Sequence, residues 1–76
     1  MRVTWDRTAD AAYLQLTGAD PAPGRTTLDC PVPDGSPATV FADWKDGRLI
    51  GLEVLAASAV LPADLLAAAE VIDEPR

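Results

Sequence analysis

The chain has 76 residues with twelve acidic against six basic side chains, a formal net charge of −6, and one cysteine, which excludes an internal disulfide. These values predict a single small domain, residues 1–76, with a thin stability margin, because so short a chain buries only about 60% of the surface exposed on unfolding. The scattered basic residues argue against nucleic-acid binding by this chain alone. The sequence has no apolar run typical of a signal peptide or a membrane-spanning helix, so we expect a cytoplasmic protein that does not bind membranes.

Two short strands are predicted in the first part of the chain. Residues 2–5 and 11–16 alternate apolar and polar side chains, which is the period of a half-buried strand. Residues 8–16 also permit a helix, because alanine and leucine favour that conformation. Thr17 and Gly18 end the run too early for a stable helix, so a strand is the preferred interpretation.

The middle of the chain predicts one strand between two loops. Residues 18–24 and 30–37 are rich in proline and glycine, which leave few backbone donors for regular structure. The three prolines of the second loop also exclude it from a central strand. Residues 25–29 between the loops are the candidate third strand.

A hairpin is predicted over residues 38–55, with its turn at Asp46-Gly47, because Asp-Gly between apolar runs is a strong hairpin signal. A two-residue turn would place Asp43 opposite Ile50 and so put an acid on the apolar face. A three-residue loop, residues 45–47, leaves one face wholly apolar, and we therefore predict this register. On the other face it would bring Phe41 across from Gly51, whose bare backbone an aromatic ring can cover.

The last part of the chain is rich in helix formers. Pro62 suits the first position of a helix, and Asp64 falls in the first turn, where the helix dipole favours an anion. A helix of about ten residues is marginal alone and must dock on the sheet. The predicted fold is a small α+β domain, an antiparallel β-meander of four or five strands with one C-terminal helix packed on one face.

Two blocks of sequence, residues 5–16 and 41–58, resemble the bacterial domain-of-unknown-function family numbered 2283. Trp5 stands for the usual tyrosine, Ala12 stands for leucine, and residues 30–37 form a proline-rich insert. The resemblance implies a dimeric β-meander with a C-terminal helix and no established activity. Some relatives lie beside small toxin-like proteins, which suggests an antitoxin role. The matching positions are Asp6, Ala9, Asp10, Ala11, Tyr13, Leu16, Asp46, Gly47, Arg48, Gly51, Glu53 and Ser58.

A candidate polar cluster consists of Asp6, Asp10, Arg48 and Glu53. Asp6 and Asp10 flank one turn, and with Glu53 they could serve a metal-dependent hydrolase or nuclease. The favoured alternative is structural: Asp6 caps the turn, Asp10 makes a local or inter-strand bond, and Arg48 and Glu53 pair with these acids. The chain has no histidine to activate Cys30 or a serine, so we predict no catalytic residue, metal ligand or cofactor.

The function that the sequence favours is a non-enzymatic protein-interaction domain. The second sheet face would carry Phe41, Leu49, Glu53 and Leu55 and is too apolar to be left in water, so these residues are the predicted homodimer interface. The acidic surface suits a basic protein partner. A small-molecule binding module, with its pocket under the loop of residues 30–37, is a further alternative.

Overall fold

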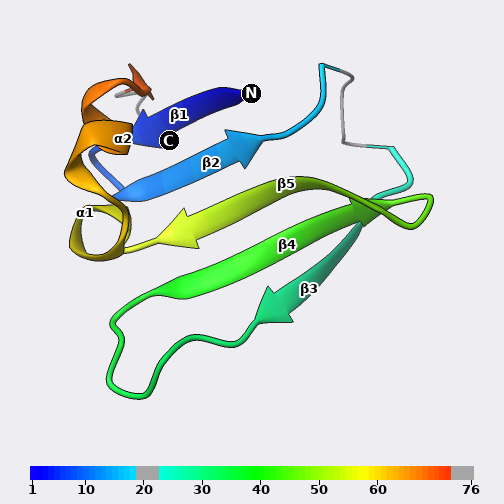
Figure 1. The fold of residues 1–76 in the computed structure, drawn as a ribbon, viewed down its shortest axis with the longest axis horizontal. Coiled ribbons are helices and arrows are strands. Elements are labelled where there is room, and N and C mark those ends of the chain that lie inside the picture. Colours follow the sequence, from blue (N-terminus) through cyan, green and yellow to red (C-terminus); the bar gives the residue numbers. More distant parts are fainter. Residues whose placement is uncertain (19–22, 73–76) are drawn as a thin grey trace.

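The computed structural model describes residues 1–18 and 23–72, which form one six-stranded sheet with two short helices (Figure 1). Neighbouring strands are antiparallel except β6, which runs parallel to β1. The predicted α+β class is confirmed, whereas the prediction of four or five strands is wrong. In chain order the strands are β1 (Arg2–Asp6), β2 (Ala11–Gln15), β3 (Thr26–Cys30), β4 (Thr39–Lys45), β5 (Arg48–Leu55) and β6 (Glu70–Val71).

The strand order β3-β4-β5-β2-β1-β6 combines a hairpin, β1–β2, with a three-stranded meander, β3–β4–β5. The two units join where β2 pairs with β5, so the chain passes from β2 to the far edge of the sheet before it returns. The sheet is therefore not a simple meander. Most of the predicted loop over residues 18–24 lies outside the described residues, and no helix among residues 1–18 and 23–72 is long and apolar enough to cross a membrane.

The β4–β5 hairpin has a two-residue turn, so the predicted three-residue loop is wrong. Lys45 pairs with Arg48, and both turn residues have positive φ, 52° at Asp46 and 76° at Gly47, as a type I′ turn requires. A β-bulge follows, because Trp44 pairs with Leu49 while Asp43 pairs with Gly51. The extra residue in the bulge is Ile50.

The bulge explains why the faces of the hairpin, apart from that of Leu49, were predicted correctly from the wrong register. One extra residue on β5 shifts the side-chain alternation. Ala42 therefore lies opposite Leu52, and Asp43 stays off the apolar side. Phe41 consequently lies across from Glu53 rather than Gly51, which corrects the predicted pair. We call the side that carries Ala42 and Leu52 the helix-bearing face, and the side that carries Asp43 the polar face.

Two short helices, α1 (Ala57–Val60) and α2 (Ala63–Ala67), replace the single predicted helix. Leu61 and Pro62 are extended, with ψ values of 148° and 140°, so the helical path is interrupted between them. Pro62 is the N-cap of α2 rather than its first residue, because its ψ is extended, and it cannot continue α1 because it supplies no N–H. After α2 the chain turns back, and Glu70–Val71 adds β6 beside β1.

The core is small and lies where the helices meet the sheet. Its buried residues are Ala12, Val54, Ala57 and Leu66, and Trp5 and Leu61 are among the partly buried side chains around them. The helices gather beside β1, β2 and the end of β5, while β3 and β4 extend away from them (Figure 1). No large side chain among the described residues is completely buried, and the helices leave part of the helix-bearing face uncovered, where Leu28, Trp44 and Leu49 stay exposed.

Candidate functional site

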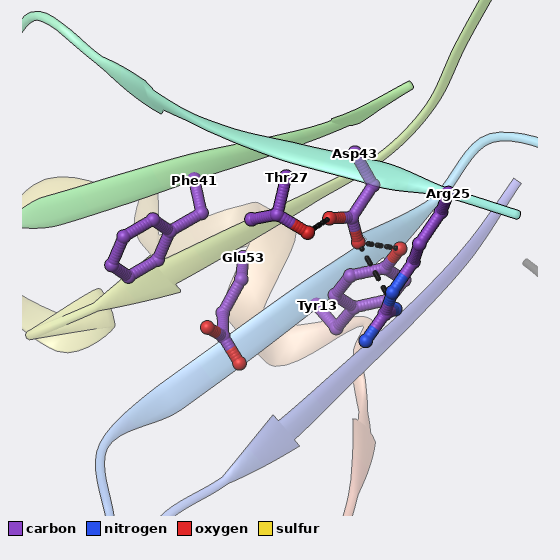
Figure 2. Close-up of a pocket in the computed structure, with 6 residues that line it drawn as sticks. All are labelled: Tyr13, Arg25, Thr27, Phe41, Asp43 and Glu53. Atoms are coloured by element: carbon purple, nitrogen blue, oxygen red, sulfur yellow. Dashed lines mark hydrogen bonds and ion pairs between the residues drawn. The ribbon is translucent and has the colours of Figure 1, made fainter. Parts of the chain in front are cut away.

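The polar face holds a pocket of about 230 Å³ that four strands or their flanks build together (Figure 2). Neighbouring strands bring its side chains into two adjacent rows. In one row Thr27 pairs with Asp43 and Asp43 with Gly51, and in the other Phe41 and Tyr13 lie on either side of Glu53. The lining residues are Tyr13, Arg25, Thr27, Phe41, Asp43 and Glu53.

Asp43 is the centre of the hydrogen bonding in this pocket. Its side chain is 6% exposed, and three side chains donate to its carboxylate. Tyr13 donates its hydroxyl to Oδ2 at 2.7 Å, Thr27 donates its hydroxyl to Oδ1 at 2.6 Å, and Arg25 donates from Nη1 to Oδ2 at 3.3 Å. Both carboxylate oxygens are therefore engaged, which is what a buried charge requires.

Gly51 allows Tyr13 to reach this carboxylate. The phenol lies close to the β5 backbone at Gly51, and a Cβ atom at residue 51 would collide with the Tyr13 hydroxyl and lie 2.5 Å from its Cζ. Any larger residue at position 51 would have to push the ring away from Asp43. An aromatic ring does cover Gly51, as expected, but it comes from the neighbouring strand β2 instead of from Phe41.

The protonation states follow from these contacts. Burial raises the pKa of Tyr13 to about 12, with further contributions from the hydrogen bond to Asp43 and from its charge. Burial alone would raise the pKa of Asp43, but hydrogen bonds from Thr27 and Tyr13 and the charge of Arg25 outweigh it, and the pKa is lowered. At neutral pH Asp43 is thus an ionised hydrogen-bond acceptor and Tyr13 a protonated donor.

A second polar cluster ties the β1–β2 turn to α1. Asp10 adopts a left-handed conformation with φ 52°, and its backbone oxygen accepts the N–H of Ala57 at 3.0 Å. Its carboxylate accepts the Ser58 hydroxyl at 2.7 Å, the Ser58 N–H at 3.0 Å and the Trp5 indole N–H at 3.1 Å. The hydrogen bonds from the Ser58 hydroxyl and Trp5 hold the pKa of Asp10 below its ordinary value.

The candidate polar cluster predicted from sequence is divided among three places. Asp6 is 3% exposed and accepts the N–H groups of Thr8 and Ala9 at 3.0 and 3.2 Å, so it caps its own turn. Arg48 lies beside the hairpin turn opposite Lys45, and Glu53 lies between Tyr13 and Phe41. Within the described ranges, no group of three Asp, Glu, Cys or His residues is arranged to hold a metal ion.

The residues predicted as an interface also separate. Phe41, Glu53 and Leu55 occupy the polar face, but the bulge turns Leu49 to the helix-bearing face opposite Trp44. Of the six pocket residues, the sequence singled out Phe41 and Glu53 and missed the other four. Tyr13, Gly51 and Asp43 share one face by strand alternation, which was a partial signal, but the β2–β5 pairing that unites them could not be seen in the sequence.

The uncovered part of the helix-bearing face is the second notable surface. Leu28, Trp44 and Leu49 are 55%, 38% and 38% exposed. Beside them a groove of about 500 Å³ runs between the sheet, the end of α1 and the loop that follows β3. We call this surface the open apolar face; it comprises Leu14, Leu28, Val32, Val40, Trp44, Leu49, Leu52 and Val60.

The comparisons with known proteins identify a family but no activity. No curated protein and no solved structure matches the chain. The sequence model of the family described as "Protein of unknown function (DUF2283)" matches residues 2–58, which include β1 to β5, the turn at Asp10 and Ser58. Because this match spans most of the 76 residues, the chain belongs to the DUF2283 family.

Proposed function

We propose that the chain is a non-enzymatic protein-interaction domain that forms a homodimer through the open apolar face. The observation that carries the proposal is the composition of this surface. The side chains of β3, β4 and β5 that point to the helix-bearing side include no charged residue, although the chain as a whole has a net charge of −6. Uncharged apolar surface of this extent on an acidic protein is typical of an interface.

A second copy of the chain is the occupant that fits this surface best. The patch is complementary to itself, since apolar meets apolar and pairing would bury no unpaired charge. A stable interface needs roughly 800 Å² from each partner, about a sixth of the 5032 Å² surface of one chain. Pairing would also cover Leu28, Trp44 and Leu49. Their burial would stabilise a chain whose own core buries no large side chain completely.

The acidic outer surface of such a dimer suits a basic protein partner. Each chain brings a charge of −6, and the apolar interface would leave these charges on the outside. Opposite charge accelerates the encounter with a basic protein and disfavours acidic competitors. An antitoxin-like role, in which the dimer binds and neutralises a small toxin-like protein, is one form of this function.

Sedimentation velocity tests the dimer. The wild-type chain should sediment as twice 8.0 kDa at micromolar concentration, and Leu28→Lys should be monomeric because the dimer would bury an unpaired charge. Leu28 is 55% exposed, so the substitution should leave the fold of one chain intact. The matched control is Val71→Lys, which changes a 44% exposed residue on β6 at the other edge of the sheet. A monomeric wild type, or equal effects of the two substitutions, would refute the proposal.

A small apolar ligand is a second candidate for the same surface. The groove includes Val32, Pro33 and Ser36 of the loop that follows β3, and all its other lining residues are apolar. Its volume of about 500 Å³ lies within the range of small-molecule pockets. A monomeric chain whose melting temperature rises with an apolar metabolite, and not with charged ones, would favour this function over the dimer.

A further inference from the structure

The polar face carries acidic and aromatic side chains in alternation across neighbouring strands. Asp29 of β3 pairs with Phe41 of β4, Phe41 pairs with Glu53 of β5, and Glu53 pairs with Tyr13 of β2. Residues directly opposite one another in antiparallel strands have Cβ atoms about 4.5–5.5 Å apart. The carboxylate of Glu53 therefore projects from the sheet between the side chains of Phe41 and Tyr13 (Figure 2).

Glu53 is the unbalanced charge of the pocket. Arg25 and Asp43 form an ion pair, with Nη1 and Oδ2 3.3 Å apart, so their charges compensate each other. The side chain of Glu53 is exposed, and its carboxylate makes no hydrogen bond or ion pair with the part of the chain that the structure describes. Among the six lining residues the net charge is one negative unit, and Glu53, which pairs with Phe41, carries it.

We propose that this pocket binds the cationic side chain of an arginine or lysine from a partner protein. Glu53 supplies the opposite charge, and the faces of Phe41 and Tyr13 can attract a cation through their π-electrons. The volume of about 230 Å³ is below the roughly 300–1,000 Å³ of pockets for whole small molecules, and it suits the head group of one side chain. Asp29, on the other side of Phe41, adds negative potential at the entrance.

The other pocket residues hold this site in shape. Asp43 keeps Tyr13 in place through the hydroxyl, and Gly51 leaves room for the ring beside the β5 backbone. Arg25 lies beside Tyr13, where its charge would repel a cation, so the ligand must approach from the side of Phe41 (Figure 2). The site lies on the polar face and is independent of the homodimer, which would use the other side of the sheet.

An NMR titration of the full chain with N-acetyl-arginine methylamide tests the site. The amide signals of Tyr13, Phe41 and Glu53 should shift and saturate, whereas the uncharged citrulline derivative should cause no saturable shift. Glu53→Gln should weaken binding about fivefold, the upper range for an exposed ion pair. Phe41→Leu should weaken it about threefold through the lost cation–π contact.

Asp34→Asn is the charge-matched control, because Asp34 is an exposed acid in the loop between β3 and β4. It should bind the arginine derivative as the wild type does. Equal binding of the citrulline derivative, or an equal loss in Asp34→Asn and Glu53→Gln, would overturn the proposal. A peptide with one arginine among neutral residues should bind at least as tightly as methylguanidinium, and tighter binding of free methylguanidinium would exclude a protein side chain as the ligand.

Discussion

The contact between Tyr13 and the backbone of Gly51 leads to a specific prediction for Gly51→Ala. A Cβ atom at residue 51 would collide with the Tyr13 hydroxyl, and the ring is fixed by its hydrogen bond to Asp43. Gly51 does not have a positive φ, so alanine meets no backbone strain at this position. The whole cost of the substitution should therefore come from displacing the tyrosine ring.

The magnitude follows from the contacts that would be lost. The hydrogen bond from Tyr13 to the ionised Asp43 is worth about 1.5–3 kcal/mol, and overpacking typically costs about 1–3 kcal/mol. Alanine should regain about 0.5–1 kcal/mol relative to glycine in a strand. We expect Gly51→Ala to lower the free energy of unfolding by about 2–5 kcal/mol, a large part of the total stability of a small domain.

Urea unfolding followed by the fluorescence of Trp5 and Trp44 measures this change, at one protein concentration because dimerisation would add to stability. Tyr13→Val is the matched background, since valine is too short to reach residue 51. In that background Gly51→Ala should be neutral or stabilising by up to about 1 kcal/mol. Trimethylamine N-oxide can be added equally to every sample if the background is too unstable. The same cost in both backgrounds, or no cost in the wild type, would refute the steric argument.

Two further predictions concern protonation. Tyr13 is the chain's single tyrosine, so its phenolate absorbance should appear near pH 12 in the wild type and at a lower pH, still above 10.0, in Asp43→Asn, which removes the charge but not the burial. Because the folded-state pKa of Tyr13 is raised, the contribution of its protonated phenol to stability is present below pH 10.0 and is lost as the pH rises towards 12. A wild-type titration midpoint near 10.0 would contradict the burial of the phenol. Ser58→Ala should raise the pKa of Asp10, which carboxyl carbon NMR measures. The stability that this variant loses should shrink as the pH falls below 3.8, because the hydrogen bond that lowers the pKa of Asp10 stabilises only its ionised form. Ser36→Ala, which removes the acceptor for the Ala38 N–H, should show a loss that does not depend on pH in this range.

The local parts of the fold were predictable because neighbouring residues determine them. Alternating side chains indicated the strands, and Asp46-Gly47 indicated the hairpin turn. The bulge at Ile50 was not predictable, since one extra residue in a strand leaves no pattern of its own in an apolar run. The requirement for one wholly apolar face nevertheless placed Ala42 and Leu52 on the correct side of the sheet. The buried face, and not the turn, determines which side each residue occupies.

The candidate site was less predictable because it depends on long-range pairing. Asp43 receives hydrogen bonds from residues 30, 18 and 16 positions away in the sequence. These residues meet only because β2 pairs with β5 while β3 pairs with β4, and no local pattern specifies that order. Pro62 was recognised as a helix signal, but one position decides whether a proline starts a helix or separates two, and only the start of one helix was predicted.

The two proposed surfaces lie on opposite faces of one sheet, which gives them linked roles in an assembled dimer. If two copies pair through their helix-bearing faces about a two-fold axis, both polar faces point outwards and both Glu53 pockets remain open. A basic partner with two suitably spaced cationic side chains would then bind both pockets, and the second contact would benefit from a high effective concentration. Loss of the dimer by Leu28→Lys would remove this advantage without changing the affinity of one pocket, whereas Glu53→Gln would weaken each pocket and leave the dimer intact.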